Sequence, residues 1–149
     1  MSFRQYLSCY SPPVTCAPVK EGIGLVNISL WIVQVLLALA FLLAGVPKAT
    51  QPIPALAKRI TWANDVPEPL VRLIGVAEIL GALGLILPAL TGILPWLTVA
   101  AAIGLAVVMA AAIIFHILRG ETNRIAMNVI LLALLLFVVY GRLALTPLA

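Results

Sequence analysis

Four long apolar runs dominate the chain and cover residues 25–46, 70–87, 96–118 and 124–145. Each run is close to the roughly 20 residues that an α-helix needs to cross the hydrocarbon core of a bilayer. None of them carries the continuous charged face that a surface helix of a soluble protein turns toward water. The pattern therefore predicts an all-α fold, an integral membrane four-helix bundle.

The connections between the runs differ in length. Residues 88–95 and 119–123 are short and predict tight turns between antiparallel helices. The long connection, residues 47–69, is rich in proline, yet residues 55–63 can form a short interfacial helix. In such a helix Leu56 and Ile60 share one side, Lys58 and Arg59 lie on the other, and Trp62 suits the headgroup level. A plain loop with an isolated tryptophan is the alternative.

Composition supports the membrane assignment. Hydrophobic residues make up 64% of the chain and charged residues 9%, against roughly 45–50% and 25% in soluble domains. A chain of 149 residues could not hide so much apolar surface from water. The net charge of +4 is spread over the connections without a basic block, so nucleic acid is not an expected partner.

Residues 1–24 precede the four-helix domain, residues 25–149, and contain three prolines that disfavour a regular helix. We expect them to form a polar, proline-rich surface tail. The tail holds Cys9 and Cys16 without a Cys-x-x-Cys pattern or a nearby histidine, so we expect no metal site there. A Cys9–Cys16 disulfide is feasible in an oxidising compartment, and two unpaired thiols are the alternative. The segment before Cys9 has no apolar core, which argues against a signal peptide.

Polar side chains inside the runs gather near one membrane face. The connections 47–69 and 119–123 must lie on the same side of a four-helix bundle, and five polar residues adjoin them: Lys48, Arg72, Glu78, His116 and Asn128. From the rise per residue, Glu78 lies roughly 10–13 Å below that surface. An ionisable group at this depth is costly and indicates either a functional site or a buried pair.

Two interpretations of this cluster stay open. In the first, Glu78 is protonated or pairs with Lys48, Arg72 or His116, and the buried pair fixes the register of the helices. In the second, the cluster binds a polar headgroup such as a quinone ring and relays its protons. A lone histidine such as His116 is more often an interfacial residue than a ligand, and Asn128 is more often a partner in a hydrogen bond between helices than a site residue.

The spacing of these residues resembles a known family. Gly45-x-x-Lys48, then Arg72-x-x-Gly75-x-x-Glu78-x-x-Gly81-x-x-Gly84, and a closing Tyr140-Gly141-Arg142 resemble the DoxX-like family of small four-helix membrane proteins. The resemblance covers about residues 27–142. It implies the four-helix fold and marks Lys48, Arg72, Glu78 and Gly81 as motif positions. The glycines Gly45, Gly75, Gly81 and Gly84 would permit close helix contact.

Activity is not specified by this resemblance. The family includes a subunit of thiosulfate:quinone oxidoreductase and membrane partners of other enzymes, but nothing here marks the chain as the thiosulfate enzyme. The runs hold no Ser/His/Asp set, no histidine pair for haem and no Gly-rich phosphate loop. We therefore favour a non-catalytic accessory or assembly subunit of a larger membrane complex, with redox or energy transduction as the expected setting. A quinone- or small-molecule-binding protein is the alternative, and a small transporter is a weaker third.

Basic residues are distributed unevenly between the two membrane faces. Six lie on the side of the long connection and three on the side of the termini, the first group being Lys48, Lys58, Arg59, Arg72, Arg119 and Arg124 and the second Arg4, Lys20 and Arg142. The positive-inside rule then places the long connection in the cytoplasm and both termini outside. We expect a bacterial cytoplasmic (inner) membrane, with other membrane subunits or further copies of the chain as partners.

Overall fold

A computed structural model describes residues 18–146, of which the side chains of residues 18–23 and 61 are left undescribed. Cys9 and Cys16, and with them the disulfide prediction, lie outside this range. The described chain consists of α1 (Pro18–Thr50), α2 (Ile53–Ala57), a 3₁₀ turn η2 (Thr61–Asn64), α3 (Glu68–Thr91), α4 (Trp96–Leu118), α5 (Thr122–Tyr140) and a π-helical turn η3 (Gly141–Leu145). Four of its helices are long and apolar enough to cross a membrane. The predicted all-α four-helix membrane bundle is thereby confirmed.

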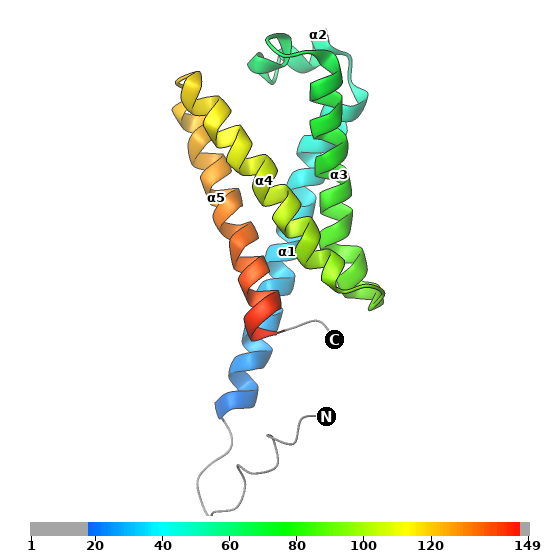
Figure 1. Cartoon of the computed structure of the whole chain (residues 1–149), viewed down its shortest axis with the longest axis vertical. Helices are drawn as coiled ribbons and strands as arrows, with labels where there is room; N and C mark the ends of the chain where they lie inside the picture. Colours follow the sequence, from blue (N-terminus) through cyan, green and yellow to red (C-terminus); the bar gives the residue numbers. More distant parts are fainter. Residues whose placement is uncertain (1–17, 147–149) are drawn as a thin grey trace, which may run out of the picture.

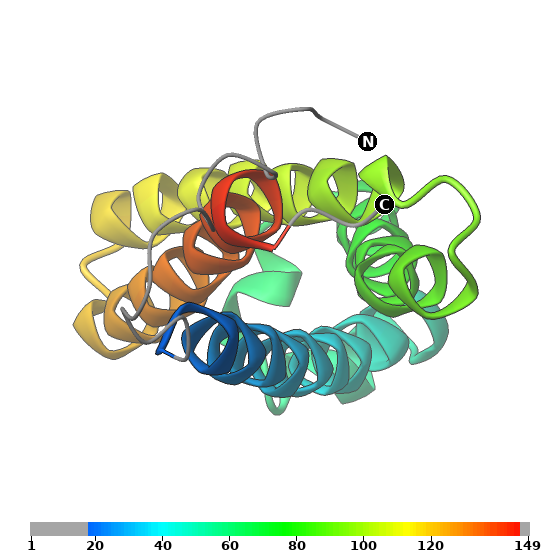
Figure 2. The same ribbon diagram turned by 90° about the horizontal axis from the view of Figure 1, so that it is seen from below.

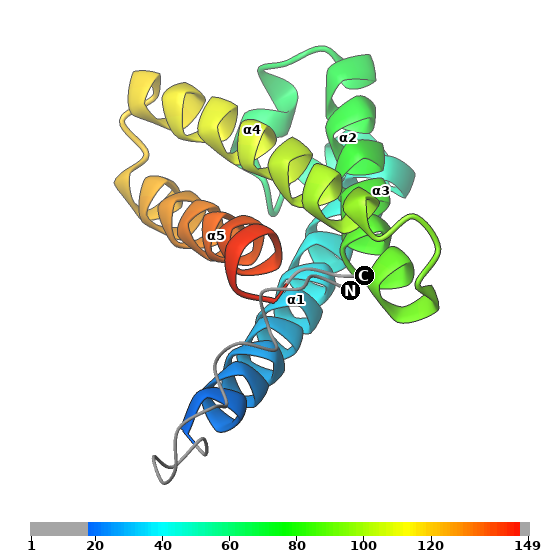
Figure 3. The ribbon, with the colours of Figure 1, turned by 60° about the horizontal axis from the view of Figure 1, so that its bottom comes forward.

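The four long helices form a ring in the order α1, α3, α4, α5, seen from one end in Figure 2. Helix α1 packs mainly along α3, and α4 along α5. The two pairs meet in the half of the bundle where α1 begins and η3 ends, and they separate toward the end that carries α2 (Figures 1 and 3). The main core therefore lies where the pairs meet, and includes Phe41, Leu85, Leu105, Met109 and Leu135.

A second, smaller core closes the separated end. Trp62 of η2 packs edge-on against Phe115 of α4, with 5.8 Å between the ring centroids. Leu56 of α2, Ala63 of η2 and Val71 of α3 complete this core. The connection between α1 and α3 thus bridges the two helix pairs.

Helix ends differ from the predicted runs where prolines occur. The first helix begins at Pro18, so residues 18–24 are helical rather than part of a tail, because proline fits the first turn of a helix. It also continues through Pro47 to Thr50, and α3 continues through Pro88 to Thr91. A proline in the last turn removes only one ladder hydrogen bond, and a membrane helix tolerates that loss. Gly92, in the left-handed conformation at φ 69°, then ends α3.

The remaining differences are smaller. Helix α4 spans the residues predicted for the third run, whereas α5 begins at Thr122 and gives way to the π-helical turn before Leu145. The single helix expected over residues 55–63 is wrong in detail, since a turn separates α2 from η2. Leu56 and Trp62 lie six residues apart and share no face of a regular helix. Breaking the helix lets both side chains enter the same core.

Candidate functional site

Lys48 and Glu78 form a buried ion pair between α1 and α3. The Lys48 Nζ lies 2.6 Å from Oε1 and 2.8 Å from Oε2 of Glu78, so it donates to both carboxylate oxygens. The two side chains are 11% and 3% exposed. Among the partners foreseen for Glu78, the structure selects Lys48. The position of Glu78 in the third turn of α3 puts this pair inside the membrane-spanning segment.

Two glycines make the pair possible. Gly45 and Lys48 are three residues apart on α1, as are Gly75 and Glu78 on α3, so each couple shares a helix face. The helices run antiparallel, and each glycine lies opposite the charged residue of the other helix. A Cβ at Gly45 would lie 3.0 Å from Glu78 Cβ, and one at Gly75 would lie 2.8 Å from Lys48 Cβ and 2.7 Å from the Ala49 nitrogen. The backbones therefore touch where the charges meet.

Gly81 and Gly84 serve the neighbouring interface. A Cβ at Gly81 would lie 2.5 Å from Leu105, and one at Gly84 would lie 2.7 Å from Ala101, so both glycines allow α4 to pack against α3. All four glycines proposed for helix packing thus stand at close contacts between helices.

Arg72 belongs to the same region but does not reach Glu78. Its Nη1 donates to the carbonyl oxygens of Lys48 (3.0 Å) and Gln51 (2.6 Å), which lie at the carboxyl end of α1. Its Nη2 lies 2.9 Å from Glu68, one turn earlier on α3. Arg72, one of the three partners considered for Glu78, is therefore not its partner in the structure. Arg72 instead caps α1, where a cation stabilises unpaired carbonyl groups, and it holds the helix end that carries Lys48.

His116 and Asn128 lie apart from the ion pair. The His116 Nδ1 is 2.8 Å from Glu121 Oε2 in the loop between α4 and α5. Arg119 joins Glu121 (2.9 Å) to Asp65 (2.8 Å), which ties this loop to the connection after η2. Asn128 is half-buried on α5, and no hydrogen bond of its side chain is found among the described residues. The expected five-residue cluster is therefore two groups, with Asn128 in neither.

Neighbouring charged and polar side chains change the pKa of Glu121 in this loop. The hydrogen bond from Arg119 holds the pKa of Glu121 below its usual value, and a further hydrogen bond from His116 acts in the same direction. Because Glu121 lies outside the membrane-spanning helices, these contacts connect the loop between α4 and α5 to the connection after η2 at the membrane surface. We call the group of His116, Arg119, Glu121 and Asp65 the polar clasp.

Comparison with models of protein families identifies the family of the chain. A family model described as the DoxX-like family matches residues 32–138, which include both glycine-and-charge couples. The chain belongs to the DoxX-like family. The resemblance inferred from the sequence is thereby confirmed. No curated protein and no solved structure among those compared matches the chain.

One polar cluster of this DoxX-like protein was missed by sequence reasoning. At the opposite end of the bundle, buried Arg142 of η3 donates from Nε to Gln34 Oε1 and from Nη1 to Asn27 Oδ1, both at 2.8 Å. Its guanidinium also lies over the ring of Trp31, 5.4 Å from the centroid. The available signal was the spacing of Asn27, Trp31 and Gln34, which puts three polar-capable side chains on one face of α1.

Proposed function

We propose that this DoxX-like protein is a non-catalytic accessory or assembly subunit of a larger membrane complex in a bacterial cytoplasmic membrane. The supporting observation is the state of its buried acid. Glu78 is the one buried carboxylate among the residues whose burial is described, and both its oxygens accept hydrogen bonds from Lys48. An acid held in this way links α1 and α3, which is the part expected of a structural ion pair.

The outer surface supplies a place for a partner. A groove of about 330 Å³ lies between α3 and α4, and much of its lining consists of small residues: Ala77, Gly81, Gly84, Ala100, Ala101 and Gly104. Gly81 and Gly84 are explained by packing within the chain, but a Cβ at Gly104 would meet nothing within 4 Å. Small residues at membrane depth let a second helix approach closely. We assign this groove to a transmembrane helix of the larger complex.

Co-purification tests this proposal. A tagged chain expressed at its native level and extracted in mild detergent is expected to elute with a larger complex. Gly104→Leu, which fills the groove, should lower the amount of co-purified complex, whereas Ala133→Leu, on an exposed face of α5, should not. A wild-type chain that elutes alone would contradict the proposal, as would equal recovery of complex from both variants.

A quinone-linked role remains the second candidate. It is favoured by one observation, that an acid and a base lie side by side within the span at 2.6 Å. Glu78→Gln separates the two roles. Loss of quinone-dependent activity in a complex that assembles in normal amount supports the quinone role, while parallel loss of assembly and activity indicates that the pair serves only to hold α1 and α3 together.

A further inference from the structure

Arg142 is a buried cation whose described partners are all neutral. It is only 3% exposed, and it contacts the amide oxygens of Gln34 and Asn27 and the face of Trp31. Within residues 18–146 as described, no carboxylate pairs with it. Its Nη2 is shielded from solvent and has no hydrogen-bond partner among the residues that the structure describes. A buried charge without a counter-charge is unfavourable, so an anion beside Arg142 would stabilise this part of the structure.

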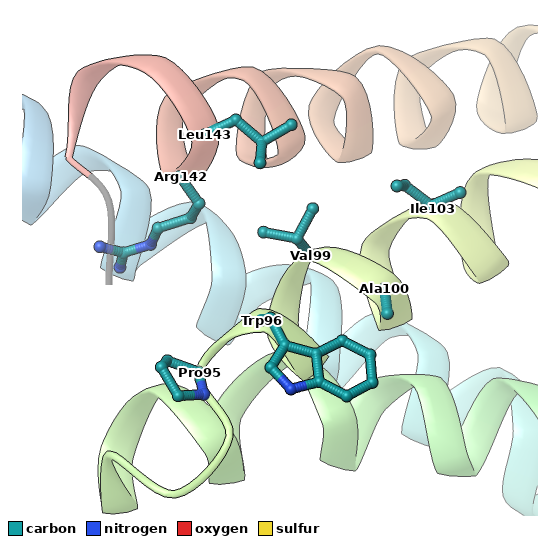
Figure 4. A pocket seen from close by; sticks show the side chains of 7 residues that line it. All are labelled: Pro95, Trp96, Val99, Ala100, Ile103, Arg142 and Leu143. Carbon is teal, nitrogen blue, oxygen red and sulfur yellow. The ribbon is translucent and has the colours of Figure 1, made fainter. Parts of the chain in front are cut away.

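A groove leads to this arginine. It has a volume of about 460 Å³ and lies between the start of α4 and η3, lined by Pro95, Trp96, Val99, Ala100, Ile103, Arg142 and Leu143 (Figure 4). Among the described residues that line the groove, Arg142 is the charged one, and the others are apolar. An anion approaching Arg142 through the groove therefore has to be attached to, or accompanied by, an apolar group.

The depth of the groove matches the region of lipid phosphates. Arg142 lies three residues before the end of η3 at Leu145, so its Cα is roughly 5 Å from that helix end. Trp96 opens α4 and is 61% exposed, in keeping with the preference of tryptophan for the headgroup level. Val99 and Ile103 follow one and two turns further along α4, toward the middle of the span.

We propose that Arg142 binds the phosphate of an acidic phospholipid, one acyl chain of which lies in the groove along Val99 and Ile103. With Nε and Nη1 occupied, Nη2 is the donor left for a phosphate oxygen. Because Nη2 is shielded in the structure, binding requires the guanidinium to shift toward the groove, and arginine is well suited to phosphate. Basic pockets between transmembrane helices recognise acidic headgroups in this way. The π-helical turn contributes, because Gly141 packs directly against Leu30 and turns Arg142 toward α1. Such turns often occur at functional sites.

Lipid retention tests the proposal without knowledge of any partner complex. The full chain, purified in mild detergent and stripped of lipid, is titrated with dioleoylphosphatidylglycerol or dioleoylphosphatidylcholine, and bound lipid is counted by native mass spectrometry. We expect phosphatidylglycerol to bind about tenfold more tightly, as a charged hydrogen bond would provide. Arg142→Gln should remove this preference, while Arg119→Gln, which removes the same charge at the other membrane face, should retain it.

A second variant separates the lipid from a simple anion. Val99→Phe narrows the groove but leaves Arg142 in place, so it should reduce phosphatidylglycerol binding even if Arg142→Gln fails to fold. Equal binding of the two lipids by the wild type would overturn the proposal. It would also be overturned if Val99→Phe bound phosphatidylglycerol normally, or if inorganic phosphate at the same concentration displaced the lipid completely. None of these outcomes bears on the accessory role proposed above.

Discussion

Removing one partner of the Lys48–Glu78 pair should be far more damaging than removing both. Lys48→Met leaves Glu78 buried without a counter-charge, and Glu78→Leu does the same to Lys48. Breaking a buried pair by removing one partner costs about 3–5 kcal/mol, whereas replacing both partners by apolar side chains is often neutral. The double variant should therefore return to within about 1 kcal/mol of the wild type.

The structure further predicts that the two single variants differ. Lys48 lies two residues from the end of α1, so a lysine freed of its partner can extend its ammonium group toward the membrane surface. Glu78 lies ten residues into α3, roughly 15 Å along the helix. Its short side chain cannot reach the membrane surface from there. Lys48→Met should therefore lie near the upper end of the range and Glu78→Leu near the lower end.

Reversible unfolding in detergent micelles, followed by circular dichroism during denaturant titration, measures these differences. Lys58→Met, at an exposed position in the connection after α2, serves as the control and should stay within about 0.5 kcal/mol of the wild type. The reasoning is refuted if the two single losses simply add in the double variant, or if neither single variant differs from the control.

Three further predictions concern glycine packing, loop charge and a buried hydroxyl. Gly75→Ala places a Cβ 2.8 Å from the Gly45 carbonyl oxygen and should destabilise the folded protein by about 1–3 kcal/mol. The control Gly104→Ala, whose Cβ meets nothing within 4 Å, should be neutral or slightly stabilising. Equal stability of the two variants in micelles would contradict the close packing at Gly75. The pKa of Glu121 is lowered in the folded protein, so its contribution is complete above the ordinary carboxyl pKa of 4.5 and is lost as the pH falls through the lower folded value. The melting temperature of the wild type should fall in that acid window more steeply than that of Glu121→Gln, and parallel curves would argue against the clasp. Thr98 is fully buried, and its hydroxyl has no hydrogen-bond partner within the described part of the chain. Thr98→Val should therefore stabilise by about 1 kcal/mol; a clear loss of stability would reveal a hydrogen bond at Thr98.

Much of the fold was readable from the sequence because the physical constraint of a membrane is severe. Apolar runs of spanning length leave few alternatives to a helix bundle, and counting the spans placed Lys48 near Glu78, as one of its three possible partners. Helix ends were less accessible, since Pro47 and Pro88 lie in last turns, where a proline costs little. The path of each side chain was not predictable either. Arg72 lies one turn from Gly75, and only the crossing of α1 and α3 decides that it reaches carbonyl groups instead of Glu78.

The cluster at Arg142 shows a different limit. Arg142 was counted as one of three basic residues at the terminal face. That count predicts the orientation of the chain in the membrane but no contact of the side chain. Its partners Asn27 and Gln34 lie more than a hundred residues earlier in the chain. The π-helical turn at Gly141–Leu145, which has no clear signature in a single sequence, decides where the guanidinium points.

Contact between Lys48 and Glu78 in a lipid bilayer is the central claim, and solid-state nuclear magnetic resonance tests it directly. With ¹⁵N at the three lysines and ¹³C at glutamate carboxyl carbons, the dipolar coupling reports the distance between the ammonium and carboxylate groups. We predict a strong coupling between Lys48 Nζ and the Glu78 carboxyl carbon, as the contacts of 2.6 and 2.8 Å require, and its disappearance in Glu78→Gln. A folded protein in bilayers without that coupling would contradict the account.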